Sequence, residues 1–244
     1  MRAGPIALMW FAALAPVACS TTEASSGTAA TTTSSAAATT AATTTTTTEP
    51  SGPRAERPAA VAEIVVIGDS ITVGATPSLE EQLALAGYPV TILAQEGKRM
   101  DADPGGNTSG TDLATSLASE PDPELAADPA ERLWVVALGT NDIGNSTEVD
   151  DIVAVVDEVL EPIPDDAPLI WIDTWIAHRA EGSELMNAAI ERALDERGNA
   201  TVGRWSELAT DPGVLSGDGV HPSDRGSIEF ATLVAETVED FVGA

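Results

Sequence analysis

The stretch of sequence that decides the fold is VAEIVVIGDSITVG, residues 61–74, an apolar run that ends abruptly in Gly-Asp-Ser. Residues 64–67 are continuously apolar and mostly β-branched, which is typical of a strand buried on both faces of a parallel sheet. Such sheets carry their chemistry at the carboxyl ends of their strands. Gly68 permits a turn there, and the Ser70 hydroxyl falls where it can face a crevice. We predict that Ser70 is a nucleophile; the alternative is a serine that only caps a helix or turn.

Strand-like and helix-like patterns alternate after this stretch. Strands are predicted at residues 64–67, 89–95, 132–138, 169–175 and 200–205, and helices at residues 78–86, 111–119, 149–160, 184–197 and from Ser223 to the C-terminus. We expect Pro77 to precede the first helix. The alternation predicts a three-layer α/β/α sandwich around a five-stranded parallel sheet. We expect the flavodoxin-like strand order 2-1-3-4-5, which brings the ends of the first three strands together.

The N-terminal part differs from the rest in composition. A basic start followed by a short apolar run predicts a signal peptide at residues 1–19. Cys19, the only cysteine, directly follows the run as in bacterial lipoprotein signals, so it is a candidate for lipidation; ordinary cleavage nearby is the alternative. Residues 20–58 are almost entirely Thr, Ser, Ala and Pro, which predicts a disordered linker. One exported domain, secreted or held at the cell surface, should occupy residues 59–244.

Charge limits the partners of the chain. It contains 39 Asp and Glu against 11 Lys and Arg, for a formal net charge of −28. Such a field repels nucleic acid and anionic membranes, so we exclude both as direct partners. Membrane contact is expected only through a lipid anchor at Cys19, and solubility or adaptation to salt accounts for the acidity. We expect a monomer.

A second group of polar residues lies in SGDGVHP, residues 216–222. His221 has Asp218 three residues earlier, a spacing that lets the carboxylate reach the imidazole Nδ1 while Nε2 points at a hydroxyl. The other histidine, His178, has no carboxylate at comparable spacing, and we expect it to line the crevice. We predict that His221 is a general base oriented by Asp218; the alternative is a surface loop without a function.

A serine that attacks an acyl carbon also needs hydrogen-bond donors for the developing oxyanion. Asn141 offers a side-chain amide after the third strand, and Gly97 offers a backbone N–H after the second. Each residue alone is ordinary turn chemistry. Together with Ser70 they occupy three neighbouring strand ends of the predicted sheet.

Taken together, these motifs resemble those of the SGNH hydrolases of the GDSL-type esterase/lipase superfamily, as an exported bacterial member. The matching blocks occur in family order and are GDSI at residues 68–71, Gly97, GTND at residues 139–142 and DGVH at residues 218–221. The resemblance implies that Ser70 is the nucleophile, His221 the base and Asp218 its partner. It also implies an oxyanion hole made by the Ser70 N–H, the Gly97 N–H and the Asn141 side chain.

This resemblance implies an exported serine esterase that works through an acyl-enzyme, without a metal or cofactor. Its partner would be a small-molecule or cell-envelope ester. The acidic surface and the few aromatic residues in the loops disfavour fatty-acid substrates, so we expect short-chain or acetyl esters. Two alternatives remain, a cell-envelope O-acyltransferase with the same triad and a catalytically idle wall-binding module.

Overall fold

The computed structural model describes residues 61–102, 106–119 and 128–243. The predictions for the signal peptide at residues 1–19, for Cys19 and for the linker at residues 20–58 lie outside these ranges. Within them, no helix is both long enough and apolar enough to cross a membrane.

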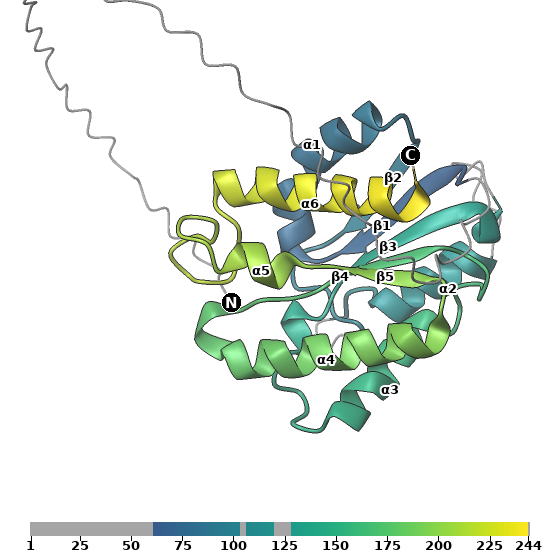
Figure 1. Ribbon diagram of the computed structural model, residues 1–244. Coiled ribbons are helices and arrows are strands. Elements are labelled where there is room, and N and C mark those ends of the chain that lie inside the picture. Colours follow the sequence, from purple (N-terminus) through teal and green to yellow (C-terminus); the bar gives the residue numbers. More distant parts are fainter. Residues whose placement is uncertain (1–60, 103–105, 120–127, 244) are drawn as a thin grey trace, which may run out of the picture. The chain divides into compact units, whose positions relative to one another are not determined.

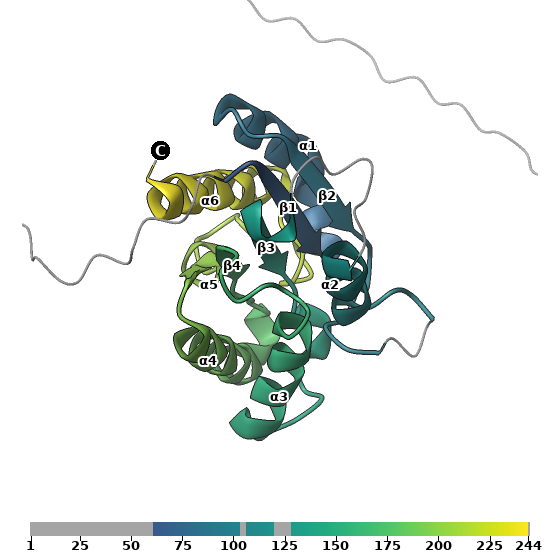
Figure 2. The same cartoon turned by 90° about the vertical axis from the view of Figure 1, so that its right-hand side faces the viewer.

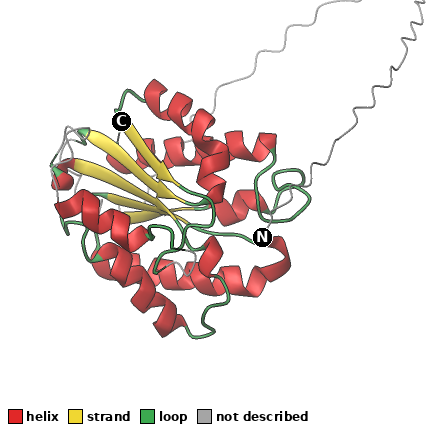
Figure 3. Cartoon of the chain, turned by 180° about the vertical axis from the view of Figure 1, so that it is seen from behind, coloured by secondary structure: helices red, strands yellow, loops and turns green. Residues whose placement is uncertain are grey.

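A parallel sheet of five strands forms the middle layer (Figure 3), and its order is β2-β1-β3-β4-β5. The strands are β1 (Glu63–Gly68), β2 (Val90–Ala94), β3 (Arg132–Ala137), β4 (Leu169–Ile172) and β5 (Ala200–Gly203). Every residue of β1, β3 and β4 is buried, which explains why these strands read as continuous apolar runs. The predicted fold class and strand order are confirmed.

Helices cover both faces of the sheet (Figures 1 and 2). One face carries α1 (Ser70–Leu85), α5 (Trp205–Ala209) and α6 (Asp224–Val242); the other carries α2 (Gly110–Ser119), α3 (Val149–Leu160) and α4 (Ala180–Arg197). Short 3-10 helices lie at η1 (Pro129–Glu131), η2 (Thr140–Asp142) and η3 (Ala177–Arg179). The side chains of β1 point alternately to the two faces of the sheet and so contribute to a hydrophobic core on each face. Ile64 and Val66 face α1 and α6, while Val65 and Ile67 face the helices of the opposite layer.

The prediction for the first helix is wrong at its start. Helix α1 begins at Ser70 and contains Pro77, which we expected to precede it. A proline inside a helix cannot donate to the carbonyl four residues earlier, here that of Val73. Both Val73 and Pro77 are exposed, so water can satisfy this carbonyl and the helix continues.

Three other boundaries differ from expectation near the carboxyl edge of the sheet. Strand β4 ends at Ile172 and β5 at Gly203, each shorter than predicted, and α4 already begins at Ala180. Trp205, expected to end the last strand, begins α5 and packs edge-on against Phe230 with ring centroids 5.3 Å apart. Trp205 is therefore buried against α6 and not within the sheet.

Candidate active site

Strand register brings the three predicted strand ends together. Gly68 of β1 pairs with Ala94 of β2 on one side and with Ala137 of β3 on the other. Ser70, Gly97 and Asn141 follow these three paired residues within a few positions. They therefore lie at one edge of the sheet, as the strand order predicts.

Ser70 is the first residue of α1, immediately after a buried carboxylate. The Asp69 side chain caps this helix, because its Oδ1 accepts a hydrogen bond from the Ile71 N–H at 2.9 Å. Gly68 must be glycine, since a Cβ there would lie 2.1 Å from Thr72 Oγ1 of the first helical turn. The strand thus passes into the helix almost without a loop and presents Ser70 at the edge.

The structure brings Ser70, His221 and Asp218 into one hydrogen-bonded chain. Ser70 Oγ lies 3.0 Å from His221 Nε2, and His221 Nδ1 lies 2.8 Å from Asp218 Oδ2. This is the geometry in which a carboxylate orients an imidazole against a hydroxyl. The three residues come together across 151 positions of sequence, the separation between Ser70 and His221.

Asp218 and His221 are held by a loop that is bonded largely to itself. We call residues 216–222 the base loop. Asp218 Oδ1 accepts hydrogen bonds from the N–H groups of Val220 and His221 and from the Ser216 hydroxyl, at 2.8, 3.0 and 2.8 Å. Together with the His221 ring, these donors hold the pKa of the Asp218 carboxyl well below its usual range. Asp218 therefore stays ionised at every pH at which the base can act.

His178 lies beside this loop and outside the chain of hydrogen bonds. It is exposed on η3, and a Cβ at Gly219 would lie 3.7 Å from its Nδ1. The neighbouring Ala177 N–H donates to the Gly219 carbonyl at 2.8 Å. His178 lines a cavity of about 530 Å³ that none of Ser70, Asp218 and His221 lines.

The predicted oxyanion donors occupy the other side of Ser70. Asn141 Nδ2 donates to the Lys98 carbonyl at 3.0 Å and, more weakly, to Asp69 Oδ2 at 3.4 Å. The first bond ties the loop after β3 to the loop after β2. Gly97 has a φ of +71°, a left-handed conformation that favours glycine and turns the chain back toward this loop.

Asp142, the last residue of the GTND block, has a structural role that was not predicted from the sequence. Its Oδ2 accepts a hydrogen bond from the Met100 N–H at 3.1 Å, and its Oδ1 lies 3.9 Å from the Arg99 guanidinium. Burial raises the pKa of Asp142 to about 6. The interactions of Asn141 and Asp142 with Lys98, Arg99 and Met100 join the two segments that carry the predicted oxyanion donors. We call residues 97–100 together with Asn141 and Asp142 the oxyanion wall.

Lys98 and Asp69 are two further buried groups that sequence reasoning missed. Lys98 is 2% exposed, and its Nζ donates to the Thr108 carbonyl at 2.6 Å, which anchors the loop after β2. Burial raises the pKa of Asp69 to about 6. A lone lysine between Gly97 and Arg99 carries no sequence signal of burial. For Asp69 such a signal of burial was present in the sequence, because its position in Gly-Asp-Ser places it between the end of a strand and the start of a helix.

No group of three or more His, Cys, Asp or Glu side chains within the described ranges is arranged to hold a metal ion. The buried acids Asp69 and Asp142 are engaged by protein donors, namely the Ile71 N–H for Asp69 and the Met100 N–H for Asp142. What the arrangement offers chemically is a hydroxyl, a base with its orienting carboxylate, and amide donors around one point.

Comparison with solved structures supports the fold. The psychrotrophic esterase EstA from a Pseudoalteromonas species is 10% identical with a TM-score of 0.58, and covers 75% of this chain and 99% of its own. A Clostridium thermocellum family 3 carbohydrate esterase is 16% identical with a TM-score of 0.53, covering 74% and 96%. The C-terminal catalytic domain of Streptococcus pneumoniae peptidoglycan O-acetyltransferase A is 20% identical with a TM-score of 0.51, covering 76% and 94%.

Sequence comparison identifies the family. No protein with a curated description matches the chain. A family model described as GDSL-like Lipase/Acylhydrolase matches residues 66–227, which include Ser70, Asp218 and His221 as well as the oxyanion wall. The match spans well over half of the chain and contains the whole candidate site, so this protein belongs to the GDSL-like lipase/acylhydrolase family.

Proposed function

We propose that this protein is an exported serine esterase that hydrolyses short-chain or acetyl esters through an acyl-enzyme. The observation that carries the proposal is the unbroken chain of hydrogen bonds from Asp218 through His221 to Ser70. The carboxylate accepts from Nδ1–H, which leaves Nε2 with a lone pair for the serine hydroxyl.

In the first half of the reaction, Ser70 Oγ attacks the ester carbonyl carbon and passes its proton to His221 Nε2. The imidazolium that forms is stabilised by the ionised Asp218. The tetrahedral intermediate then collapses, and His221 returns the proton to the leaving alkoxide. The products of this half are the free alcohol and an acyl group bound to Ser70.

In the second half, His221 accepts a proton from water as the water oxygen attacks the acyl carbon. Collapse of the second intermediate breaks the bond to Ser70 Oγ, which recovers its proton from His221. The carboxylic acid leaves. The imidazole and its carboxylate are about half exposed, with side-chain accessibilities of 49% and 50%, so water reaches the base readily.

Charge on the carbonyl oxygen is stabilised by the N–H groups of Ser70 and Gly97 and by the Asn141 amide. One Asn141 N–H is held by the Lys98 carbonyl at 3.0 Å, whereas its contact with Asp69 is a long 3.4 Å. The long bond is the weaker one, so it is the bond that Asn141 exchanges for the stronger bond to an oxyanion.

The preference for short acyl groups is supported by charge and by the similar folds. A chain of formal charge −28 is repelled by the anionic lipid surfaces on which fatty esters are presented. A carbohydrate esterase and a peptidoglycan O-acetyltransferase share this fold. Both names point to acyl groups carried on sugars.

A panel of p-nitrophenyl esters graded by acyl length tests the proposal. We expect the highest kcat/KM with acetate and a steady fall as the chain lengthens, and no turnover by Ser70→Ala. A kcat/KM that rises with chain length would show a lipase-like preference instead. Absence of turnover with every ester would remove the esterase proposal.

Acyl transfer to a sugar or lipid hydroxyl is the second candidate, because the pneumococcal O-acetyltransferase domain shares the fold. The exposure of His221 favours water as the acceptor. Turnover of p-nitrophenyl acetate in the presence of increasing methyl glucoside separates the two functions. A hydrolase forms acetate throughout, whereas a transferase forms the acetylated glycoside at the expense of acetate.

Export and a lipid anchor at Cys19 are proposed from the sequence of residues 1–58, with a cell-surface or secreted location. Cys19→Ser should release the protein from the membrane fraction if the cysteine is lipidated. Wild-type protein found entirely in the medium would remove the anchor and leave the esterase proposal intact. We also propose a monomer, which sedimentation of the purified chain tests.

A further inference from the structure

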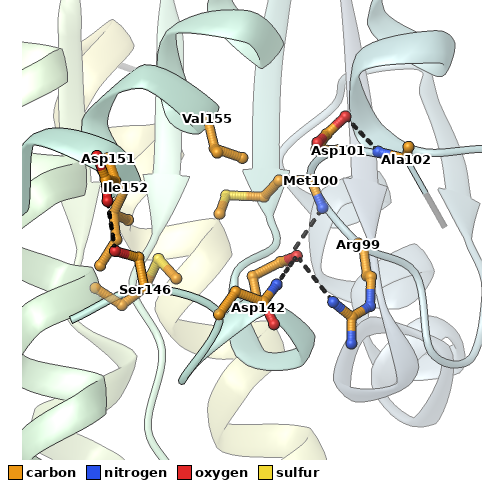
Figure 4. A pocket seen from close by; sticks show the side chains of 11 residues that line it. Arg99, Met100, Asp101, Ala102, Asp142, Ser146, Asp151, Ile152 and Val155 are labelled. Carbon is orange, nitrogen blue, oxygen red and sulfur yellow. Dashed lines mark hydrogen bonds and ion pairs between the residues drawn. The ribbon is translucent and has the colours of Figure 1, made fainter. Parts of the chain in front are cut away.

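A cavity of about 320 Å³ lies next to the oxyanion wall (Figure 4). We call it the Met100 pocket. It opens between the segment that follows Gly97, the segment that follows Asn141, and helix α3. None of Ser70, Asp218 and His221 lines it, so it is separate from the catalytic chain itself.

The pocket nevertheless shares its walls with the oxyanion donors. Asp142, whose carboxylate accepts the Met100 N–H at 3.1 Å, is both a pocket residue and the neighbour of Asn141. Asn141 in turn holds the Lys98 carbonyl at 3.0 Å. The pocket is therefore lined by the residue that follows Asn141 in the chain and by the two residues that follow Lys98.

The floor of the pocket is apolar. Met100 and Met186 are each 1% exposed and Ile152 is 6% exposed, and the partly buried Val155 completes this surface. Two thioethers with a flexible and polarisable surface adapt to irregular apolar faces. This floor suits carbon-bound hydrogens of a ligand and offers them no hydrogen bonds.

The rim of the pocket is polar and consists mainly of hydrogen-bond acceptors. Figure 4 shows Ser146 and Asp151 on one side, where the Ser146 hydroxyl donates to Asp151 Oδ2 at 2.9 Å. Asp101 and Arg99 lie on the other side. Arg99 is 3.9 Å from the buried Asp142, so the carboxylates of Asp101 and Asp151 remain to face the opening.

This combination selects the chemistry of the ligand. An alkyl chain would fill the floor but would strip water from the rim carboxylates without replacing its hydrogen bonds. An anionic group would face the carboxylates of Asp101 and Asp151, whose hydrogen-bond donors, the Ala102 N–H and the Ser146 hydroxyl, are uncharged. A neutral ring with hydroxyl donors around its edge and C–H groups on one face satisfies both surfaces. The volume is at the lower end for small-ligand pockets, which fits a single ring.

We propose that the Met100 pocket is the subsite for a neutral sugar ring that carries the ester cleaved at Ser70. This assignment rests on the proposed esterase function, and it names the alcohol part of the substrate. Asp151 and Ser146 receive the hydroxyls of the ring, and Val155, which lies beside the nearly buried Met100 and Met186, receives its apolar face.

Direct binding tests the pocket without any turnover. We would titrate methyl β-glucoside into the mature chain carrying Ser70→Ala and record saturation-transfer NMR signals of the glycoside. The proposal predicts signals that Val155→Phe abolishes, because the added ring fills the pocket. Ala154→Phe is the matched control: Ala154 is exposed on the same helix and does not line the pocket, so its signals should persist.

Kinetics give the second arm. For Asp151→Ala and for Ser146→Ala we expect the ratio of kcat/KM for an acetylated methyl glucoside to kcat/KM for p-nitrophenyl acetate to fall about 10-fold each, because a hydrogen bond to the ring is lost. Glu158→Gln, at an exposed position of α3 that does not line the pocket, should leave both rates unchanged.

Three outcomes would overturn the assignment. These are absence of glycoside signals, signals that survive in Val155→Phe, and hexanol signals that Val155→Phe removes while the glycoside gives none. The last would make the pocket an alkyl site. If glycoside binding behaves as expected while no ester is turned over, the subsite stands and the esterase proposal fails. If esters are turned over without glycoside binding, the esterase proposal stands and the subsite assignment fails.

Discussion

The two sides of Ser70 are built in opposite ways. The base loop, residues 216–222, is half exposed, and its carboxylate is satisfied by groups within a few residues of it. In the oxyanion wall Lys98, Met100 and Asp142 are buried. Its bonds join residues 42 or 43 positions apart, such as Met100 with Asp142 and Lys98 with Asn141. The base loop therefore carries chemistry almost independently of the core, whereas the wall carries chemistry and stability together.

Carboxylates on the two sides consequently have pKa values shifted in opposite directions. Hydrogen bonds to the charged form lower the pKa of Asp218, while burial raises the pKa of Asp142 to about 6. Mutations in the base loop should lower activity and leave the free energy of unfolding nearly unchanged. Mutations in the oxyanion wall should lower both the activity and the free energy of unfolding.

The largest effect is expected at the centre of the base loop. His221→Ala should lower kcat by a factor on the order of 10⁶, since the nucleophile and its base act as one unit, and Ser70→Ala should match it. Melting temperature should barely change, because His221 is exposed. His178→Ala is the control, and near wild-type rates are expected from it. A normal rate for His221→Ala with a lost rate for His178→Ala would assign the base to His178.

Loss of the orienting carboxylate should be the next largest effect. Asp218→Ala should lower kcat by a factor on the order of 10⁴, less than His221→Ala, because the imidazole remains but loses its orientation and its counter-charge. Steady-state kinetics on p-nitrophenyl acetate measure this loss. The double variant of Asp218→Ala with His221→Ala should have a kcat no lower than that of His221→Ala alone. Additive losses in kcat would show that the two residues do not act as one catalytic unit.

The oxyanion wall is tested by Asn141→Ala. We expect a loss of roughly 10² to 10³ in kcat with little change in KM, because the donor acts on charge that develops only in the transition state. The variant also loses the bond to the Lys98 carbonyl at 3.0 Å, so its melting temperature should fall. A lower melting temperature with an intact kcat of the folded fraction would make Asn141 purely structural.

The smallest expected effect is the pH dependence of the unfolding free energy, which should differ between the oxyanion wall and the base loop. Asp142 holds its proton longer in the folded state than in the unfolded chain, so its ionisation lowers the unfolding free energy as pH rises from about 4 to about 6. Relative to Asp142→Asn, wild type should lose up to about 3 kcal/mol over this window. Urea unfolding at pH 4, 5, 6 and 7 measures it.

Asp218→Asn should show the opposite sign when the same unfolding experiment is extended to pH 3 and pH 2. The folded-state pKa of Asp218 is lowered, so its ionised form stabilises wild type above pH 4, and this contribution fades as pH falls below about 4. The effect should be small, because solvent screens a half-exposed carboxylate. Equal signs for Asp142→Asn and Asp218→Asn would contradict the difference between the two regions.

Local patterns made the sheet and the base loop predictable. The apolar run of β1 and the alternation of strands with helices gave the sandwich and its strand order, because strands buried on both faces leave a continuous signal. The spacing of Asp218 and His221 placed both within one loop, where reach is set by a few residues.

Features that depend on packing between distant segments were not predictable. Burial of Lys98, the bond from Met100 to Asp142 and the floor of the Met100 pocket all arise from segments brought together by the fold. The start of α1 was missed for a related reason. Pro77 normally marks a helix boundary, and only its exposed position allows the helix to continue.

The central claim is that His221 activates Ser70 as a nucleophile. Labelling of the purified protein by a serine-directed phosphonate, followed by intact mass and by peptide mapping, tests it most directly. We predict one adduct per chain, located on Ser70, with labelling slowed strongly in His221→Ala and absent in Ser70→Ala. An unlabelled wild type, or an adduct on another serine, would contradict the account.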